Sequence, residues 1–240
     1  MRLLPDLTHR ADEQELLDAP IVNRQELIHN FRDIQRVNWL FGGTSAVLRY
    51  IEPMITDHPP STTLRVIDLA TGAADIPLAI AEWAEQKGRV LEITATDLTS
   101  DVLAIAEANT AHRNEIRCFR CDARAVPFSD GSFDIALCSL ALHHFQPDDA
   151  VTVIKEMKRL ANIGFLINDL RRSRLGYWAT WTASRVSTRS HLTRNDAPLS
   201  IRRAYTVDEL RALLSQAGID KSEISLAPWF RMVAIHRTQI

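Results

Sequence analysis

The stretch from Leu64 to Ala81 constrains the fold of this chain more than any other. An apolar run, LRVIDL, carries an acidic residue near its end and leads into the small-residue sequence ATGAAD, after which apolar residues recur at helical spacing. This order predicts a buried parallel strand, a tight turn and a helix. Small residues suit such a turn because a ligand can then lie close to the backbone, beside the N-terminus of the helix.

Beyond this segment, apolar runs and helical segments alternate along the chain. The alternation predicts βαβ units and a parallel sheet, and an ordinary strand-to-helix turn in such a domain is the simplest interpretation of 64–81. The last two runs lie on either side of Pro228-Trp229, and so short a connection predicts a hairpin whose last strand runs antiparallel. The expected strands are 64–69, 91–96, 115–120, 133–138, 163–168, 221–227 and 230–237, and the expected helices are 76–86, 100–110, 147–161 and one capped by Thr206.

Two segments stand outside this alternation. Apolar residues at helical spacing predict helices at 24–40 and 44–56, separated by a Phe-Gly-Gly hinge. After Leu170 comes an Arg-rich segment that extends to Arg203 and contains eight arginines but one acidic residue, Asp196.

Length and composition exclude several classes of protein. With 240 residues, 46% of them hydrophobic, the chain can bury the core of one sizeable α/β domain. A formal charge of −2 is not that of a general nucleic-acid binder, and no apolar run reaches the about 18 residues of a membrane span. The N-terminus lacks the apolar stretch of a secretory signal, and three cysteines cannot all pair, so we expect a cytoplasmic protein.

The turn after the first strand also carries a family resemblance. Residues 68–74 fit the pattern D-x-[GA]-x-G-x-[GA], which resembles the first motif of class I S-adenosylmethionine (SAM) methyltransferases, with alanine at 70 and 74 where that family has glycine. The block PFSDGSFDIALCS at 127–139 resembles the fourth-strand region of small-molecule methyltransferases of the ubiquinone/menaquinone-biosynthesis type. The flanking segments, 24–56 and 171–240, resemble more loosely the methyltransferases encoded near polyketide synthases.

This resemblance implies an α/β protein with the Rossmann-like seven-stranded sheet of class I methyltransferases, its last strand antiparallel. It also implies a single methyltransferase domain over residues 1–240. The expected parts of this domain are an N-terminal helical lid (1–60), the SAM-binding core (61–170), a helical insertion that caps the substrate (171–205) and a final helix with a strand hairpin (206–240).

Acidic residues end three successive strands, at the edge where doubly wound sheets bind ligands. Asp68 is placed to accept a hydrogen bond from the methionine end of SAM, Asp97 to accept both ribose hydroxyls and Asp122 to accept the adenine amino group. One acidic strand end is usually a solvated cap, but three in succession favour a cofactor site. The expected cofactor-binding residues are Asp68, Ala70, Thr71, Gly72, Asp97, Leu98, Asp122, Ala123 and Ser139.

A nicotinamide cofactor is the main alternative, because Asp97 also suits a ribose in a dehydrogenase. That fold needs the fingerprint G-x-G-x-x-G, and this turn instead places Asp75 near the position of a pyrophosphate. SAM has no phosphate and carries a sulfonium cation, so it is compatible with a carboxylate there. The sequence therefore favours SAM.

A histidine pair follows the fourth strand, and Asp169 lies at the end of the fifth. Since these strands are neighbours in the implied topology, His143 and Asp169 should emerge side by side next to the cofactor. A carboxylate fixes the tautomer of a histidine and raises its basicity, which supports a general base. The pattern resembles that of sugar and natural-product O-methyltransferases, in which the histidine deprotonates a hydroxyl acceptor. The alternatives are that His144 is the base, or that one histidine of the pair packs on the cofactor or caps the next helix.

No metal site is expected from the sequence. The His and Asp residues of this region lack ligand spacing such as H-x-x-x-H. Cys118 and Cys121 form a C-x-x-C motif, but it has no second pair for zinc and does not open a helix, so these thiols are expected to be structural.

The Arg-rich segment interleaves aromatic residues with arginines, a composition that can bind nucleic acid, a membrane face or an anionic substrate. By the family resemblance it lies where methyltransferases build a substrate cap. The alternative is a solvated helix whose aromatic residues pack on the core. Helices at 24–56 would cover the other side of the site, from which Arg36 or Asn38 could reach the SAM carboxylate. The residues expected to contact the substrate are His144, Tyr177, Trp178, His191 and Arg194.

Together these features predict a SAM-dependent methyltransferase that O-methylates a phenolic or enolic hydroxyl of a natural product. C-methylation of a quinone-type ring is the second interpretation. A nucleic-acid methyltransferase is a further alternative, although SLAL at 139–142 replaces the Asn/Asp-Pro-Pro-aromatic motif of amino-methylating enzymes. A non-catalytic SAM-fold binding protein is the last alternative. We expect a small-molecule acceptor, no nucleic-acid partner and no membrane span, and the sequence leaves the oligomeric state open.

Overall fold

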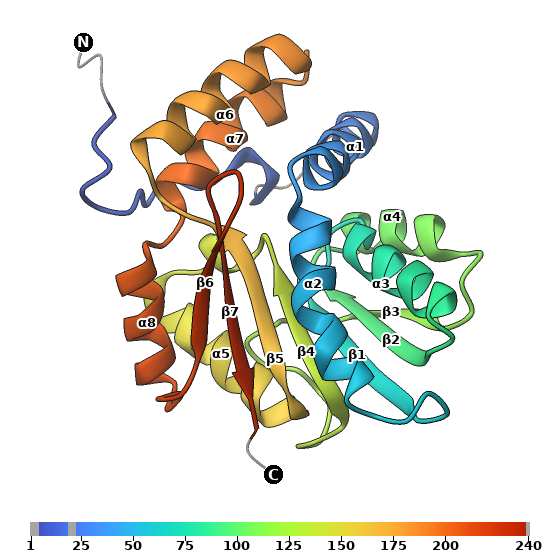
Figure 1. Cartoon of the computed structure of the whole chain (residues 1–240). Coiled ribbons are helices and arrows are strands. Elements are labelled where there is room, and N and C mark those ends of the chain that lie inside the picture. The colour runs from blue at the N-terminus through green and yellow to red at the C-terminus, as the bar shows by residue number, and fades with distance from the viewer. Residues whose placement is uncertain (1–4, 19–22, 239–240) are drawn as a thin grey trace.

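The fold centres on one mixed β-sheet with helices on both faces (Figure 1). The computed structural model describes residues 5–18 and 23–238. Within these residues, the seven-stranded sheet has the order β3-β2-β1-β4-β5-β7-β6. The strands are β1 (Thr63–Leu69), β2 (Val90–Asp97), β3 (Ile116–Arg120), β4 (Phe133–Ser139), β5 (Ala161–Leu170), β6 (Glu223–Ala227) and β7 (Arg231–Arg237).

The pairing of the strands confirms the predicted topology. Strands β1 to β5 pair in parallel, whereas β7 pairs antiparallel with both β5 and β6. The strand order reverses between β1 and β4, so the carboxyl ends of these two neighbours meet at the switch point of the sheet. Doubly wound sheets bind their ligands at this point.

Two layers of helices bury the sheet. Apolar side chains of α2, α3 and α4 pack on one face, and those of α5 and α8 pack on the other. Among the helices in the described part of the chain, none combines the length and apolar character needed to cross a bilayer. The helices are α1 (Arg24–Leu40), α2 (Gly43–Thr56), α3 (Asp75–Gln86), α4 (Ser100–Thr110), α5 (Pro147–Leu160), α6 (Arg174–Ser187), α7 (His191–Arg203) and α8 (Val207–Gln216), with short 3-10 turns η1 (Leu16–Asp18) and η2 (Leu142–His144).

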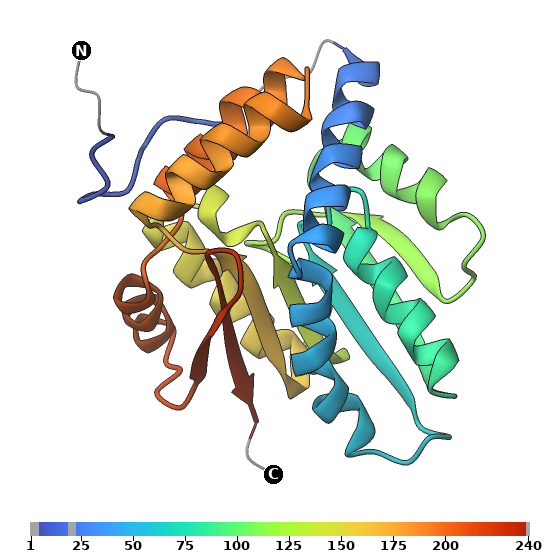
Figure 2. The same cartoon turned by 45° about the horizontal axis from the view of Figure 1, so that its top comes forward.

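The carboxyl edge of the sheet has a cover of its own. Helices α6 and α7 lie above it on one side and α1 on the other (Figures 1 and 2). The extended residues 5–18, here called the N-terminal strap, run beneath α7, whose Asp196 accepts hydrogen bonds from the backbone N–H groups of Leu16 and Leu17. The predicted lid, 1–60, also contains residues 1–4 and 19–22, which lie outside the described residues, as do the last two residues of the predicted 206–240 segment.

Each strand lies within two residues of its predicted bounds, and the differences at β5 and β7 have physical reasons. Strand β5 extends beyond the expected 163–168 at both ends, because β4 and β7 flank it and continue its hydrogen bonding. The last strand begins at Arg231 rather than at 230, because Trp229 and Phe230 adopt φ values of 60° and 63° in the hairpin turn. A positive φ does not fit the extended backbone of a strand, so Phe230 belongs to the turn.

Candidate active site

The turn that joins β1 to α3 has a left-handed backbone at three positions. Ala70, Gly72 and Ala74 have φ values of 54°, 60° and 60°. Alanine carries a conformational cost in this region that glycine does not. Both alanines pack against the hydrophobic core, so their methyl groups do not obstruct the outer side of the turn. At Gly72, by contrast, a Cβ atom would lie 3.0 Å from the ring of Phe31 in α1.

Asp68 is almost fully buried next to this turn. The Thr71 hydroxyl donates a hydrogen bond to its Oδ2 at 2.6 Å, while Oδ1 has no partner in the described part of the chain. Burial raises the pKa of Asp68 to about 7, and the carboxylates of Asp75 and Asp97 add to the effect. A buried oxygen without a partner is available to a hydrogen-bond donor on a ligand.

Asp97 ends β2 on the other side of the turn. Its Oδ2 accepts a hydrogen bond from the Gly72 N–H at 3.1 Å, and its Oδ1 accepts one from the Thr99 N–H at 3.0 Å. Burial raises the pKa of this carboxyl group. Leu98, the next residue, exposes its side chain. The backbone donors therefore fix the Asp97 carboxyl group at the strand end, as a ribose-binding residue requires.

The other predicted cofactor residues lie further along the same edge. Asp122 follows β3 and forms an ion pair with Arg124, whose hydrogen bonds hold the pKa of Asp122 below its usual value. Ala123 beside it is buried. Ser139 ends β4, where its Oγ accepts a hydrogen bond from the side-chain amide of Asn168 at 2.8 Å. Asp68 and Asp97 both accept hydrogen bonds from residues of the turn at 70–74. Asp122 and Ser139 instead contact residues outside this turn.

His143 and Asp169 emerge side by side, as the predicted strand order requires. Nδ1 of His143 lies 2.6 Å from Oδ1 of Asp169, whose Oδ2 accepts the backbone N–H of His143 at 2.9 Å. Burial acts to raise the pKa of Asp169, but His143 and the Leu170 N–H outweigh it and the pKa is lowered. An ionised Asp169 therefore accepts the Nδ1 proton, which leaves Nε2 of a neutral imidazole as the basic atom.

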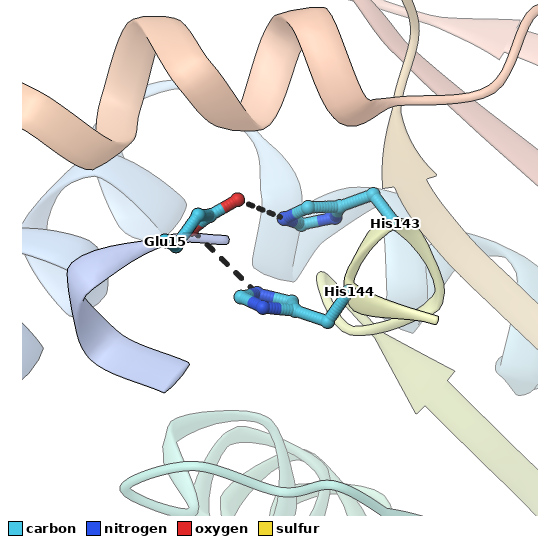
Figure 3. A group of neighbouring side chains, drawn as sticks. All are labelled: Glu15, His143 and His144. Carbon is cyan, nitrogen blue, oxygen red and sulfur yellow. Dashed lines mark ion pairs between the residues drawn. The ribbon is translucent and has the colours of Figure 1, made fainter. Parts of the chain in front are cut away.

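Glu15 of the N-terminal strap lies across from both histidines (Figure 3). Its Oε1 is 3.6 Å from Nε2 of His143, and its Oε2 is 3.8 Å from Nε2 of His144. These distances exceed the length of a hydrogen bond, and no described residue hydrogen-bonds to the buried Oε1. Sequence reasoning missed Glu15, because it lies far from the histidines in the chain and in a segment without periodicity.

A second carboxylate holds His144. Its Nδ1 lies 2.8 Å from Oδ1 of Asp18. Burial acts to lower the pKa of His144, but the charges of Glu15 and Asp18 outweigh it and raise this pKa to about 9. His144 is therefore protonated near neutral pH, which favours His143 as the base of the pair.

Two arginines fasten the strap over the histidines. Arg10, within the strap, donates hydrogen bonds to the carbonyl oxygens of His143 and Phe145. Arg203, at the end of α7, donates to the carbonyl oxygens of Glu13 at 2.6 Å and His144 at 2.7 Å. The strap, α7 and the η2 turn are thus linked into one buried polar network that the sequence did not reveal.

The same network contains a possible set of metal ligands. Among the described residues, Glu15, His143 and His144 bring donor atoms within 4.8 Å of one another. The two imidazole rings are tilted against each other, with centroids 4.4 Å apart and an interplanar angle of 36°. A histidine binds a metal only as a neutral imidazole, whereas the charges of Glu15 and Asp18 keep His144 protonated. We therefore interpret this group as a charge network around the protonated His144.

The predicted substrate residues of the Arg-rich segment lie on α6 and α7. Tyr177 and Trp178 are on α6, with their rings in edge contact at 5.4 Å. His191 begins α7 and is exposed, and Arg194 donates to the backbone carbonyls of Arg185 in α6 and Thr188 just after it. In the described structure no hydrogen bond or ion pair links these four residues to the histidines. Helix α7 reaches the histidines through Arg203 instead.

Of the two residues expected near the SAM carboxylate, α1 presents only one to the interior. Arg36 pairs with Asp33 on the surface, which directs its charge away from the turn. Asn38 is buried, and its side-chain amide donates to Oδ2 of Asp75 at 2.8 Å. Its Oδ1 accepts a hydrogen bond from Arg231 at 2.9 Å. Asn38 therefore lies next to the end of the turn, whereas Arg36 lies on the surface.

Residues 66–164 match the protein family described as "Methyltransferase domain". The central region of the chain, residues 66–164, is therefore similar to a methyltransferase domain. This match agrees with the order of strands around β1 and β4 and with the turn at 70–74. It confirms the recognition made from the sequence motifs, and with it SAM as the cofactor that this domain uses.

Relatives and solved structures resemble the methyltransferase domain. Demethylmenaquinone methyltransferase of Staphylococcus haemolyticus is 29% identical over 109 residues, which are 45% of this chain and 44% of the relative. Ubiquinone/menaquinone biosynthesis C-methyltransferase UbiE of Stenotrophomonas maltophilia is 28% identical over 174 residues, 65% of this chain and 66% of the relative. A SAM-dependent methyltransferase from Aquifex aeolicus shares the fold, with a TM-score of 0.61 and 14% identity over 90% of this chain and 99% of that one. The chain therefore matches less than half the length of the first of these relatives.

Proposed function

We propose that this protein transfers the methyl group of SAM to a small phenolic or enolic acceptor, with the acceptor oxygen as the site of methylation. The observation that carries the proposal is the buried pair of His143 and Asp169, 2.6 Å apart, at the carboxyl edge of the sheet. A base oriented in this way is needed when a weakly acidic hydroxyl has to lose its proton. A natural product with an aromatic or enolic ring is the class of acceptor that fits this chemistry.

The residues around the turn fit SAM. Oδ1 of Asp68 is buried without a described partner, and backbone donors hold Asp97 at the end of β2. In the proposal, Asp97 binds the ribose hydroxyls and Asp68 the methionine end. Thr71, Gly72 and the two alanines of the turn line the cofactor without blocking it. When bound, SAM supplies an electrophilic methyl group on a sulfonium, and the carbon–sulfur electron pair returns to sulfur as the acceptor oxygen takes the methyl group.

The acceptor proton leaves through His143. Nε2 takes the hydroxyl proton as the oxygen–methyl bond forms, and the ionised Asp169 holds the Nδ1 proton and stabilises the resulting imidazolium. A general base typically contributes about 10²–10⁴-fold to a rate. Alignment of the acceptor with the methyl group in a dry site supplies the rest.

The elements that cover the carboxyl edge of the sheet exclude water from the proton transfer to His143. Glu15, His143 and Asp169 are each 3% exposed or less. In the proposal the strap and helices α1, α6 and α7 enclose the acceptor, with Tyr177 and Trp178 offering flat apolar surfaces to an aromatic ring. Because the Glu15 carboxylate lies beside Nε2, it also favours the imidazolium that forms there.

C-methylation of a quinone-type ring is the second candidate, and the similarity to UbiE favours it. A phenolate or enolate shares its negative charge between the oxygen and a carbon of the ring. Proton transfer to His143 therefore prepares the acceptor for methylation at either atom. The position of the acceptor relative to the methyl group decides between them.

The experiment that tests the proposal combines SAM carrying a ¹³C-labelled methyl group with a panel of resorcinols and dihydroxynaphthalenes. We expect S-adenosylhomocysteine (SAH) to accumulate only when an acceptor is present, and a new oxygen-bound methyl signal in the carbon NMR spectrum. A carbon-bound methyl signal would support the second candidate. Turnover with none of the acceptors, together with tight SAH binding, would favour a non-catalytic binding protein instead.

We propose a small-molecule acceptor and no nucleic-acid partner, because the fourth strand leads into SLAL at 139–142. We also expect the protein to work in the reducing cytoplasm. The thiols of Cys118, Cys121 and Cys138 are unpaired in the structure, which fits that compartment.

A further inference from the structure

Arg231, the first residue of β7, is buried with most of its hydrogen-bonding capacity unused. It is 2% exposed, and its Nη2 donates to Oδ1 of Asn38 at 2.9 Å. Within the described residues, neither Nε nor Nη1 has a hydrogen-bond partner. A buried guanidinium with unmet donors is costly, and burial lowers the pKa of Arg231 to about 10. Such a group is prepared for an anion that arrives from outside the protein.

A carboxylate lies close to this guanidinium without neutralising it. Asp75 opens α3 directly after the turn at 70–74, and its Oδ2 accepts the side-chain amide of Asn38 at 2.8 Å. Burial raises the pKa of Asp75. Asn38 thus bridges Arg231 and Asp75, and among the described ion pairs there is none between the two. Asn38 therefore holds the guanidinium of Arg231 and the carboxyl group of Asp75 near each other without direct contact between them.

Two contacts hold Arg231 in this position. A Cβ atom on Gly43 would lie 2.8 Å from Cζ of Arg231 and 2.9 Å from Oδ1 of Asn38, so the first residue of α2 has to be glycine for the groups to approach. Phe41, between α1 and α2, makes an edge contact at 4.9 Å with Trp229 in the β6–β7 turn. The connection between α1 and α2 therefore packs against the tip of the β6–β7 hairpin. Both lie at the same edge of the sheet as the turn at 70–74 (Figure 1).

The charges around Arg231 place Arg231, Asn38 and Asp75 between two parts of the proposed site, the turn at 70–74 and the pair of His143 and Asp169. The negative groups that act on Arg231 are Asp169, the partner of His143, and Asp75 at the end of the turn. The reacting methyl group must lie near His143, and the ribose near Asp97. The amino-acid end of the cofactor, which the proposed function assigns in part to Asp68, is the part left for Arg231.

We propose that Arg231, Asn38 and Asp75 recognise the α-amino-acid end of SAM. Arg231 binds the α-carboxylate with Nε and Nη1, the two donors that lack partners, and Asp75 accepts a hydrogen bond from the α-ammonium group. Asn38 holds the two side chains at the spacing of the two charges. This inference rests on the proposed function, since it assigns part of the same cofactor site to the C-terminal hairpin.

The test compares two ligands that share the adenosine and the thioether but differ in the amino acid. SAH carries it, whereas 5′-methylthioadenosine does not. Calorimetry is performed with wild-type protein and with Arg231→Met, Arg231→Lys and the control Arg237→Met, an exposed arginine of the same strand that pairs with Asp57. We expect Arg231→Met to weaken SAH binding by about 10- to 100-fold and to leave methylthioadenosine binding within about twofold.

The other variants separate recognition from folding. Arg231→Lys should recover part of the SAH affinity, because it restores the charge without the paired donors. Arg237→Met should bind both ligands like the wild type. Without ligand, Arg231→Met should unfold at a temperature no lower than the wild type, because it removes a buried charge that has no ion pair in the described residues.

Three results would overturn the inference. The first is unchanged SAH affinity in Arg231→Met. The second is an equal loss for SAH and methylthioadenosine, which would assign Arg231 a role in the fold. The third is a wild-type protein that binds neither ligand, and this result would contradict the proposed function itself. The wild-type measurement therefore distinguishes a failure of the inference from a failure of the function.

Discussion

Oε1 of Glu15 and Nε2 of His143 lie 3.6 Å apart, although the two residues are far from each other in the sequence. Asp169 holds the other nitrogen of the same ring. The imidazole of His143 is thus enclosed by one carboxylate that orients it and one that faces its basic atom. Because Glu15 belongs to the N-terminal strap and faces both His143 and the protonated His144, the stability of the strap is linked to the chemistry of the site.

The first prediction concerns His144, whose folded pKa of about 9 exceeds the about 6.5 of an unperturbed histidine. Its charge therefore stabilises the folded protein fully below about pH 6.5, and this contribution is lost as the pH rises through about 9. Urea unfolding of wild type and His144→Gln should show the variant less stable at about pH 6, with the difference shrinking toward about pH 10. His112→Gln, at an exposed position, is the control. A difference that stays constant with pH would show that the charge of His144 plays no part.

Asp97 gives a prediction for cofactor binding. If its carboxylate accepts the ribose hydroxyls, Asp97→Ala should weaken SAH binding by about 1.5–3 kcal/mol for each charged hydrogen bond lost. Calorimetry measures this change, and Asp101→Ala in the exposed first turn of α4 is the matched control. Equal affinity of Asp97→Ala and wild type would remove this residue from the site.

The turn after β1 makes a prediction about stability. Ala70 has a φ of 54°, a backbone region that glycine adopts at lower cost. Ala70→Gly should therefore raise the free energy of unfolding by about 0.5–1 kcal/mol. Ala108→Gly, at an exposed position inside α4, should lower it by a similar amount, because glycine weakens helices. Destabilisation of both variants in urea unfolding would mean that packing of the Ala70 methyl group outweighs the backbone cost.

Metal removal tests the interpretation of Glu15, His143 and His144 as a charge network. Dialysis against a chelator should leave both the SAH affinity and the rate of methyl transfer unchanged, because a protonated His144 does not bind a metal ion. Elemental analysis of the purified protein accompanies the measurement. Stoichiometric zinc or iron, with a loss of activity on chelation, would show a metal centre instead.

Much of the sheet could be predicted from the sequence because local patterns encode it. The apolar run at 64–69, the small-residue turn and the periodic helix that follows each carry their own signal, and the helix expected at 100–110 has those bounds in the structure. The His143–Asp169 pair also follows from sequence, because parallel strands that are neighbours bring their carboxyl ends together.

The strap and the buried arginine could not be predicted in this way. Glu15 meets the histidines through the packing of an aperiodic segment beneath α7, and Arg231 reaches Asn38 through the register of the last hairpin and the bend between α1 and α2. No periodic pattern in the sequence indicates either contact, since each depends on how distant elements pack. Polar side chains that look like surface residues in the sequence are buried for this reason.

The most direct test of the account is the pH dependence of methyl transfer by wild type, His143→Ala and Asp169→Asn on one phenolic acceptor. With His143 as the base, the variant lacking it should lose about 10²–10⁴-fold in kcat while binding SAH like the wild type, and Asp169→Asn should lose less. The gap should narrow toward about pH 10, where a phenol ionises without help. Superimposable pH profiles with similar kcat values for wild type and His143→Ala would contradict the account and show that the site works by proximity alone.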